Sequence, residues 1–291
     1  METVPGARRH VPAAARRMWP RFMRAAARHD ALPAETGLRC AALQGYSHWY
    51  IDGNLRGEEP SGFSASRLQA LHTAIAHNGV QPIYHGSCRS MLGSRERARA
   101  DAGVTHVLDE IELCNALGGA PLVLHGGGVS APQRSPQARA RALQQAVETL
   151  RPLVDIAATR GVPVWMESLC GYMRFHPFDY LCTTEEEVTS MLEQVPRLCC
   201  FLDVSNAWMN GGDPVAMFRR LHHRIVGLCI SDLDRCGMAR HAAEHATPPV
   251  CRLLAAADAL EWSGIIAFTA ETTDVRTGLH DLDQLLRRTP P

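Results

Sequence analysis

The sequence predicts a single-domain α/β protein in which eight parallel strands close into a (β/α)8 barrel. Short apolar segments alternate strictly with amphipathic helical segments, a pattern typical of parallel strands. The length of 291 residues is normal for such a barrel. Six of the apolar segments carry a His, Asp, Glu or Cys at or near their carboxyl ends. The alternative is a doubly wound open sheet, whose site lies at one switch point. Functional residues at the ends of six separate strands fit a closed ring better.

The segment VPVWMES, residues 162–168, is the clearest of these strands. It is apolar on both faces, follows Gly161 and ends in Glu167, which is typical of a strand buried on both sides. The other segments are QPIYHG ending in His85, APLVLHG in His125, CCFLDVSN containing Asp203, IVGLCISD containing Cys229, and IIAFTAE ending in Glu271. Because the carboxyl ends of barrel strands lie on one face, we expect these side chains to converge on one site.

The helices between the strands have recognisable caps. Ser-Pro and Asp-Pro pairs, a Thr-to-Glu capping box and terminal glycines mark their ends. The predicted helices run from Ser64 or Ser66 to Asn78, from about Arg95 to Leu117, from Pro136 to Gly161, from Thr184 through Val195, from Pro214 through Leu221, through residues 253–260, and through a closing helix around Leu282–Leu286.

The first part of the chain is the least informative. We assign residues 1–36 to an N-terminal segment with a weak first strand at 10–15 and a helix at 19–29, and residues 37–291 to the barrel. A strand is expected at 38–46, followed by a polar loop to residue 61.

Composition excludes several kinds of chemistry. All 30 residues of the Lys plus Arg count are Arg, so no lysine is available for a Schiff base, a pyridoxal-phosphate anchor or a P-loop. The balance of 30 basic and 30 acidic residues argues against a dedicated nucleic-acid partner. No apolar run reaches membrane-spanning length, and no secretory signal is recognisable. The ten cysteines lack a disulfide spacing pattern. We therefore expect a cytoplasmic protein with a small-molecule substrate and no membrane association, and leave a homo-oligomer open.

Glu167, Asp203 and Glu271 are three carboxylates on apolar strands. Buried together they would repel one another, so a divalent metal is the natural neutralising group, with pairing to arginines as the alternative. His85 and His125 would complete an oxygen and nitrogen site suited to Mn, Zn, Co or Fe, or would be hydrogen-bonded structural residues.

Three further residues each have more than one predicted role. Cys229 is a soft metal ligand, a nucleophile or a plain buried thiol. Asn206 and His241 either bind substrate or order loops.

Five motifs together resemble the xylose-isomerase-like barrel superfamily, which holds sugar isomerases and epimerases and the endonuclease IV type of apurinic-site nuclease. HGSCRSML at His85 and LVLHGGG at His125 look like the segments around the first two metal histidines of the nuclease branch. VWMES at Glu167, FLDVSN at Asp203 and FTAET at Glu271 look like the shared metal carboxylates. The resemblance covers nearly the whole chain and implies a TIM barrel with a divalent metal.

The departures concern the nuclease chemistry. Asn206 stands where the nuclease pattern has a histidine, and Cys229 stands where both branches carry a metal histidine. The Asp-x-His pair is reduced to His241, with Ala239 at the aspartate position. The third metal of a nuclease-type site is therefore not expected.

The resemblance to the epimerase branch implies a metal-dependent isomerase or epimerase for a sugar, sugar phosphate or similar hydroxy-carbonyl compound. Two carboxylates flanking the substrate would transfer the proton. An endonuclease IV-like hydrolase with a reduced metal site, a degenerate non-catalytic barrel and a specialised biosynthetic enzyme are the alternatives. The predicted catalytic residues are Glu167, Glu271 and His85; the metal ligands Glu167, Asp203, Glu271, His125 and Cys229; and the substrate-binding residues His85, Asn206 and His241.

Overall fold

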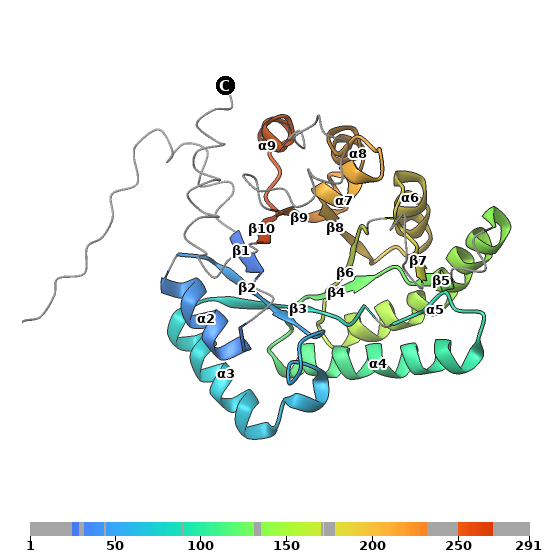
Figure 1. The fold of residues 1–291 in the computed structure, drawn as a ribbon. Coiled ribbons are helices and arrows are strands. Elements are labelled where there is room, and N and C mark those ends of the chain that lie inside the picture. Colours follow the sequence, from blue (N-terminus) through green and yellow to red (C-terminus); the bar gives the residue numbers. More distant parts are fainter. Residues whose placement is uncertain are drawn as a thin grey trace, which may run out of the picture.

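The computed structural model describes residues 25–28, 32–43, 45–88, 90–130, 135–169, 171, 178–231 and 250–269. Eight parallel strands form a closed barrel in the order β1-β10-β9-β8-β6-β4-β3-β2, and the pairing of β2 with β1 closes the ring (Figure 1). The predicted fold class is confirmed. The six apolar segments that sequence patterns assign to strands are all strands of this ring.

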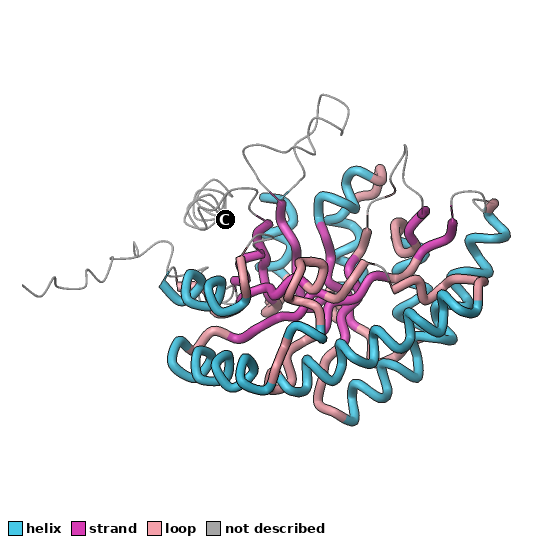
Figure 2. Tube along the Cα trace, turned by 60° about the horizontal axis from the view of Figure 1, so that its bottom comes forward, coloured by secondary structure: helices cyan, strands magenta, loops and turns pink. Residues whose placement is uncertain are grey.

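The barrel strands are β1 (Ala25–Arg28), β2 (His48–Asp52), β3 (Gln81–His85), β4 (Leu122–His125), β6 (Val164–Glu167), β8 (Cys199–Asp203), β9 (Ile225–Ser231) and β10 (Ile265–Thr269). The helices are α2 (Ala34–Leu43), η1 (Pro60–Gly62), α3 (Ala65–Asn78), α4 (Arg97–Ala116), α5 (Pro136–Thr159), α6 (Glu185–Gln194), α7 (Val204–Met209), α8 (Pro214–Leu221) and α9 (Val250–Ala259). The helices lie around the outside of the strands, which occupy the centre of the molecule (Figure 2).

The helix boundaries follow the expected capping chemistry. The Ser64 hydroxyl accepts a hydrogen bond from the Arg67 backbone N–H, and Ser135 and Thr184 cap α5 and α6 in the same way. Gly79 ends α3 with a φ of 69°, a left-handed conformation that glycine adopts without a steric penalty. These helix starts and this stop are therefore confirmed.

The apolar core has two parts. A large cluster fills the layer between the strands and the helices, and a smaller one fills the inside of the ring. Inside the ring, Phe201 stacks on Trp165 at 5.9 Å between ring centroids and contacts Tyr50 edge-to-face at 5.7 Å. A Cβ added at Gly227 would lie 2.0 Å from the Phe201 ring, so this position of β9 has no room for a side chain. The barrel is thus a packed core below its carboxyl end.

The strand predicted at 38–46 is wrong. Residues 34–43 form helix α2, because Ala34, Leu38 and Ala41 recur at helical spacing and are buried together. The strand lies at His48–Asp52 instead, inside the segment predicted to be a polar loop. Its three buried residues, Trp49 to Ile51, form an apolar run too short to stand out between polar neighbours.

The predicted helix at 19–29 is also wrong at residues 25–28, the part of it that the structure describes. Residues 25–28 form β1, which pairs with β10 and β2, so tertiary pairing in the ring overrides the helical preference of three consecutive alanines. These four residues belong to the barrel sheet although they lie within the predicted N-terminal segment 1–36. The strand predicted at 10–15, the loop at 233–248 and the closing helix at 282–286 lie outside the described residues.

A two-stranded antiparallel sheet was not predicted. β5 (Gly128–Ser130) pairs with β7 (Phe178–Tyr180) just beyond the carboxyl ends of β4 and β6. Arg139 on α5 joins β7 to this helix, since it pairs with Asp179 at 3.1 Å and donates to the Tyr180 carbonyl at 2.7 Å. No helix in the described part of the chain is long and apolar enough to cross a membrane.

Candidate metal centre at the carboxyl end of the barrel

The candidate site is the inward-facing layer directly above the apolar interior of the ring. Residues two apart along a strand face the same side. The interior cluster contains Tyr50, Ile83, Val123, Trp165 and Phe201. The residues two positions farther along the same five strands are Asp52, His85, His125, Glu167 and Asp203. Strand periodicity alone therefore brings these five polar side chains to one level at the carboxyl end of the barrel.

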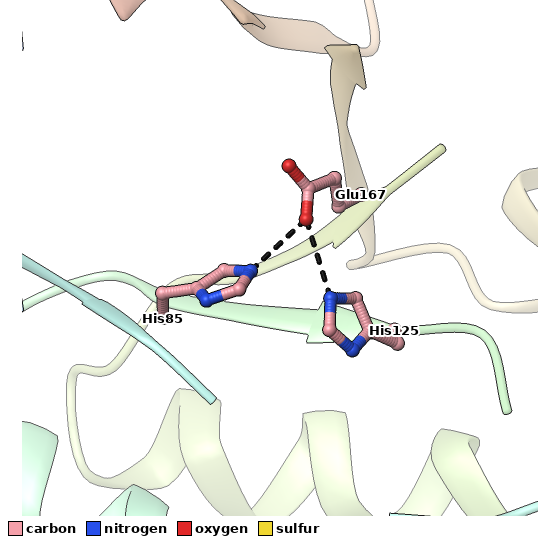
Figure 3. Close-up of side chains that lie close together, drawn as sticks. All are labelled: His85, His125 and Glu167. Atoms are coloured by element: carbon pink, nitrogen blue, oxygen red, sulfur yellow. Dashed lines mark hydrogen bonds and ion pairs between the residues drawn. The ribbon is translucent and has the colours of Figure 1, made fainter. Parts of the chain in front are cut away.

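Glu167 lies at the centre of this layer. Its Oε2 atom is 3.0 Å from Nε2 of His85 and 3.3 Å from Nε2 of His125, so one carboxylate oxygen contacts both imidazoles (Figure 3). The two imidazole rings lie edge-to-face with their centroids 5.0 Å apart. All three side chains are buried. A buried carboxylate is costly without a positively polarised neighbour, and the two ring nitrogens supply that here.

Asp52 is a member of the site that the sequence patterns missed. Its Oδ1 lies 3.3 Å from Nδ1 of His85 and accepts hydrogen bonds from the backbone and side chain of Asn54 at 3.0 and 2.8 Å. Burial raises the pKa of the Asp52 carboxyl, but the hydrogen bond and charge of His85 and the bonds from Asn54 outweigh it and hold this pKa well below its usual range. Asp52 thereby orients the His85 ring toward Glu167.

Asp203 is held by the turn into α7. Its side chain caps this helix, since Oδ1 accepts a hydrogen bond from the Asn206 backbone N–H at 2.8 Å. Its own backbone N–H donates to the hydroxyl of Ser168 at 2.9 Å, and Ser168 directly follows Glu167. Ser168 therefore joins the end of β6 to the end of β8 and fixes the spacing of the two carboxylates.

Cys229 lies inside the ring beside these carboxylates. It is fully buried, and the strand register places it opposite Asp203 on β8. One donor atom each from Glu167, Asp203 and Cys229 fall within 4.8 Å of one another. The donor atoms of His85, His125 and Glu167 satisfy the same condition, so Glu167 is common to both groups.

These two groups fit a divalent transition metal. Imidazole nitrogen, carboxylate oxygen and thiol sulfur are the ligand types of Zn, Fe and Co sites, and the carboxylates and imidazoles also suit Mn. The donor atoms are buried and already close together, as binding a metal would require. The residues present therefore fit the metal that the resemblance implies.

The predicted site residues have different outcomes. The structure brings together His85, His125, Glu167, Asp203 and Cys229. Asn206 lies at the edge of this group, where its side-chain amide donates to the Ser168 carbonyl at 3.2 Å. Glu271 and His241 lie outside the described residues, so their predicted roles stay predictions.

A cavity of about 950 Å³ lies beside the site. Two residues of its lining adjoin the site: the Asn54 side chain donates to Asp52, and the Tyr180 ring lies 6.4 Å from the His125 ring. Its lining includes Asn54, Arg56, Ser87, Met91, His106 and Tyr180. The cavity is large enough for a small polyol.

A model of the family described as xylose isomerase-like TIM barrel matches residues 38–287. The chain belongs to this family. The resemblance identified from the five motifs is therefore confirmed. No curated protein matches the chain.

Solved structures of similar fold include several sugar epimerases. A D-tagatose 3-epimerase-like protein is 15% identical with a TM-score of 0.75, over 91% of this chain and 97% of its own. The 3-keto-D-glucoside 4-epimerase from E. coli is 17% identical with a TM-score of 0.70, over 91% and 98%. A probable 3-DHS dehydratase from Bacillus anthracis is 15% identical with a TM-score of 0.64, over 92% and 100%. At these identities the likeness concerns the xylose isomerase-like fold.

Proposed function

We propose that the protein is a metal-dependent isomerase or epimerase acting on a sugar, a sugar phosphate or a similar hydroxy-carbonyl compound. The observation that carries this proposal is the cluster of buried His, Glu, Asp and Cys donor atoms around Glu167 at the carboxyl end of the barrel. Active sites of barrel enzymes lie at this end. The epimerases of similar fold support the same class of reaction.

Glu167 is the proposed base of the reaction. Its carboxylate takes a proton from the carbon next to the substrate carbonyl, and the electron pair of the broken C–H bond moves into an enediolate. Glu271, which we assign as the acid, returns a proton to the opposite face of the same carbon or to the neighbouring carbon, so that no atom is gained or lost. A bound Mn, Zn, Co or Fe ion would polarise the carbonyl and hydroxyl oxygens of the substrate.

The other residues prepare Glu167 for this step. His85 and His125 both contact Oε2, which holds this oxygen in place, and we assign proton transfer to Oε1. His85 is itself oriented by Asp52 and would also contact the substrate, which the adjacent cavity would hold. Asn206 and His241 remain proposed substrate contacts.

Two other functions are less well supported. A phosphodiester hydrolase of the endonuclease IV type would use the ligands that Asn206 and Cys229 replace, and we expect no cleavage of an abasic-site duplex at low salt. A non-catalytic barrel would be favoured by a tightly filled site, whereas a cavity of about 950 Å³ adjoins this one.

The test is exchange of substrate hydrogen with deuterium from D2O, followed by NMR, with a panel of ketoses and the protein loaded separately with Mn, Co, Zn and Fe. Exchange reports proton abstraction even when the product resembles the substrate. We expect exchange that falls by about 10²–10⁴ in Glu167→Gln, the usual contribution of a general base. Full exchange in both Glu167→Gln and Glu271→Gln would contradict the two-base mechanism.

Bound metal is measured in parallel by elemental analysis, on protein purified without a chelating tag. About one or more equivalents of metal, lost in Glu167→Ala, are expected. The control is Ser135→Ala, which removes the hydroxyl that caps helix α5 but no proposed ligand, and it should keep both metal and exchange. Absence of metal after addition of all four ions would overturn the proposal.

A further inference from the structure

Cys229 differs from the other buried cysteines in what it faces. Cys114, Cys182 and Cys200 belong to the apolar cluster between the strands and the helices. Cys229 belongs to the cluster inside the ring, and its sulfur lies within 4.8 Å of carboxylate oxygens of Glu167 and Asp203. Of these four cysteines, only Cys229 has its sulfur in a group of donor atoms that could hold a metal ion.

The surroundings of this sulfur favour a cation. Two carboxylates buried side by side repel each other in a low-dielectric interior, and their burial is tolerated only when positive charge compensates it. The point that is equally near to both carboxylates is also near the Cys229 sulfur, because all three donor atoms lie within one 4.8 Å group. A cation bound there would contact sulfur as well as oxygen.

We propose that Cys229 binds the metal of this site as a thiolate, next to Glu167 and Asp203. This inference rests on the metal site of the proposed function and adds the identity of one ligand. On binding, the thiol proton is released to solvent and a metal–sulfur bond forms, with no change of oxidation state. Thiolate is a soft ligand, so the site would prefer Zn, Co or Fe(II) to Mg or Mn.

The chain offers a matched control for this sulfur. Cys200 is a fully buried cysteine on β8, the strand that pairs with β9. It faces the outer apolar cluster, whereas Cys229 faces the inside of the ring. Cys200→Ser and Cys229→Ser therefore make the same chemical change in adjacent strands, and only the second removes a proposed ligand. Cys229→His replaces the sulfur ligand by an imidazole nitrogen.

The experiment loads the full-length protein with Co²⁺ and records its electronic absorption spectrum. A thiolate bound to Co²⁺ produces an intense sulfur-to-metal charge-transfer band in the near ultraviolet, which oxygen and nitrogen ligands do not. We expect this band in the wild type and in Cys200→Ser, and its loss in Cys229→Ser and Cys229→His. X-ray absorption of the zinc-loaded wild type should show one sulfur at about 2.3 Å.

Metal affinity is measured on the same proteins by competition with a chelator. Cys229→Ser should bind Zn²⁺ at least about tenfold more weakly, since removal of even an outer partner of a metal ligand costs that much. The wild-type spectrum tests the proposal without any variant, so a variant that fails to fold does not prevent the test.

The outcomes separate this inference from the proposed function. Wild-type protein that holds Co²⁺ or Zn²⁺ with only nitrogen and oxygen ligands would overturn the thiolate, whatever the deuterium-exchange result. A sulfur signature in a protein that exchanges no substrate hydrogen would support the thiolate and contradict the isomerase proposal. Protein that binds no metal would overturn both.

Discussion

Ser168 is a residue whose replacement should lower both the stability of the protein and its metal affinity. Its hydroxyl is buried between β6 and β8 and accepts the hydrogen bond of the Asp203 backbone N–H at 2.9 Å. It contributes no metal ligand of its own. Ser168→Ala removes this acceptor and leaves Glu167 and Asp203 chemically intact.

The expected loss of stability comes from the backbone N–H of Asp203. A buried donor left without an acceptor costs about 1–3 kcal/mol. At roughly 2 °C per kcal/mol for a chain of this size, the midpoint of thermal unfolding should fall by about 2–6 °C. Because Ser168 fixes the spacing of the carboxylates at the ends of β6 and β8, metal affinity should fall by about 10–100-fold, as for other outer-shell partners.

The comparison variant is Ser135→Ala on helix α5. It removes the hydrogen bond from the Ala138 N–H to the Ser135 hydroxyl, at 3.1 Å, and loss of such a cap costs about 0.5–2 kcal/mol. Thermal unfolding is measured on chelator-treated protein, so that metal does not contribute to the midpoint, and affinity by chelator competition. Both variants should lose stability, and only Ser168→Ala should lose affinity.

Two results would refute this reasoning. If Ser168→Ala kept the wild-type midpoint without metal, the hydrogen bond to Asp203 would contribute nothing to stability. If Ser135→Ala lost affinity to the same extent, weaker binding would follow from general destabilisation.

Two other substitutions test the layers of the ring. Asp52→Asn should lower the exchange rate by about 10–100-fold through misorientation of His85. The pKa of Asp52 is lower in the folded protein than in the unfolded chain. The ionised carboxylate therefore stabilises the fold fully above the ordinary carboxyl pKa of about 4, and this stabilisation is lost as the pH falls toward the folded-state pKa. If the stability difference between the wild type and Asp52→Asn grew as the pH was lowered, this reasoning would be contradicted. Gly227→Ala would place a methyl group 2.0 Å from the Phe201 ring and should destabilise the barrel by about 1–3 kcal/mol or more, measured by urea unfolding. The same change in a Phe201→Leu background should cost less, and an equal cost in both backgrounds would rule out the clash with the ring.

Much of the site could be predicted because it follows from strand ends. His85, His125, Glu167 and Asp203 each end an apolar run, and the carboxyl ends of parallel strands share one face of a barrel. Their convergence therefore needed only the strand assignment. Which atoms meet could not be predicted, since the contact of both imidazoles with one oxygen of Glu167 depends on side-chain conformations.

Asp52 was missed because the strand before it was misplaced. Residues 38–46 have an apolar content that suits a strand or a helix, and the choice of strand left 48–52 to a loop. The pairing of β2 with β3, which sets Asp52 opposite His85, is a contact between segments more than 30 residues apart. Local patterns contain no information on such pairing, so an aspartate in a polar stretch had no signal that marked it as functional.

The two inward layers of the ring have separate physical tasks. The lower layer, with Trp165 stacked on Phe201 against Gly227, fills the barrel and tolerates little change in volume. The upper layer takes one side chain from each of β2, β3, β4, β6 and β8, and Cys229 of β9 lies beside two of them. Cys229 belongs to both layers, because it packs within the apolar cluster inside the ring and its sulfur lies beside Glu167 and Asp203. Cys229→His should therefore keep a bound metal and shift its preference toward Mn, at a cost in stability from the larger side chain.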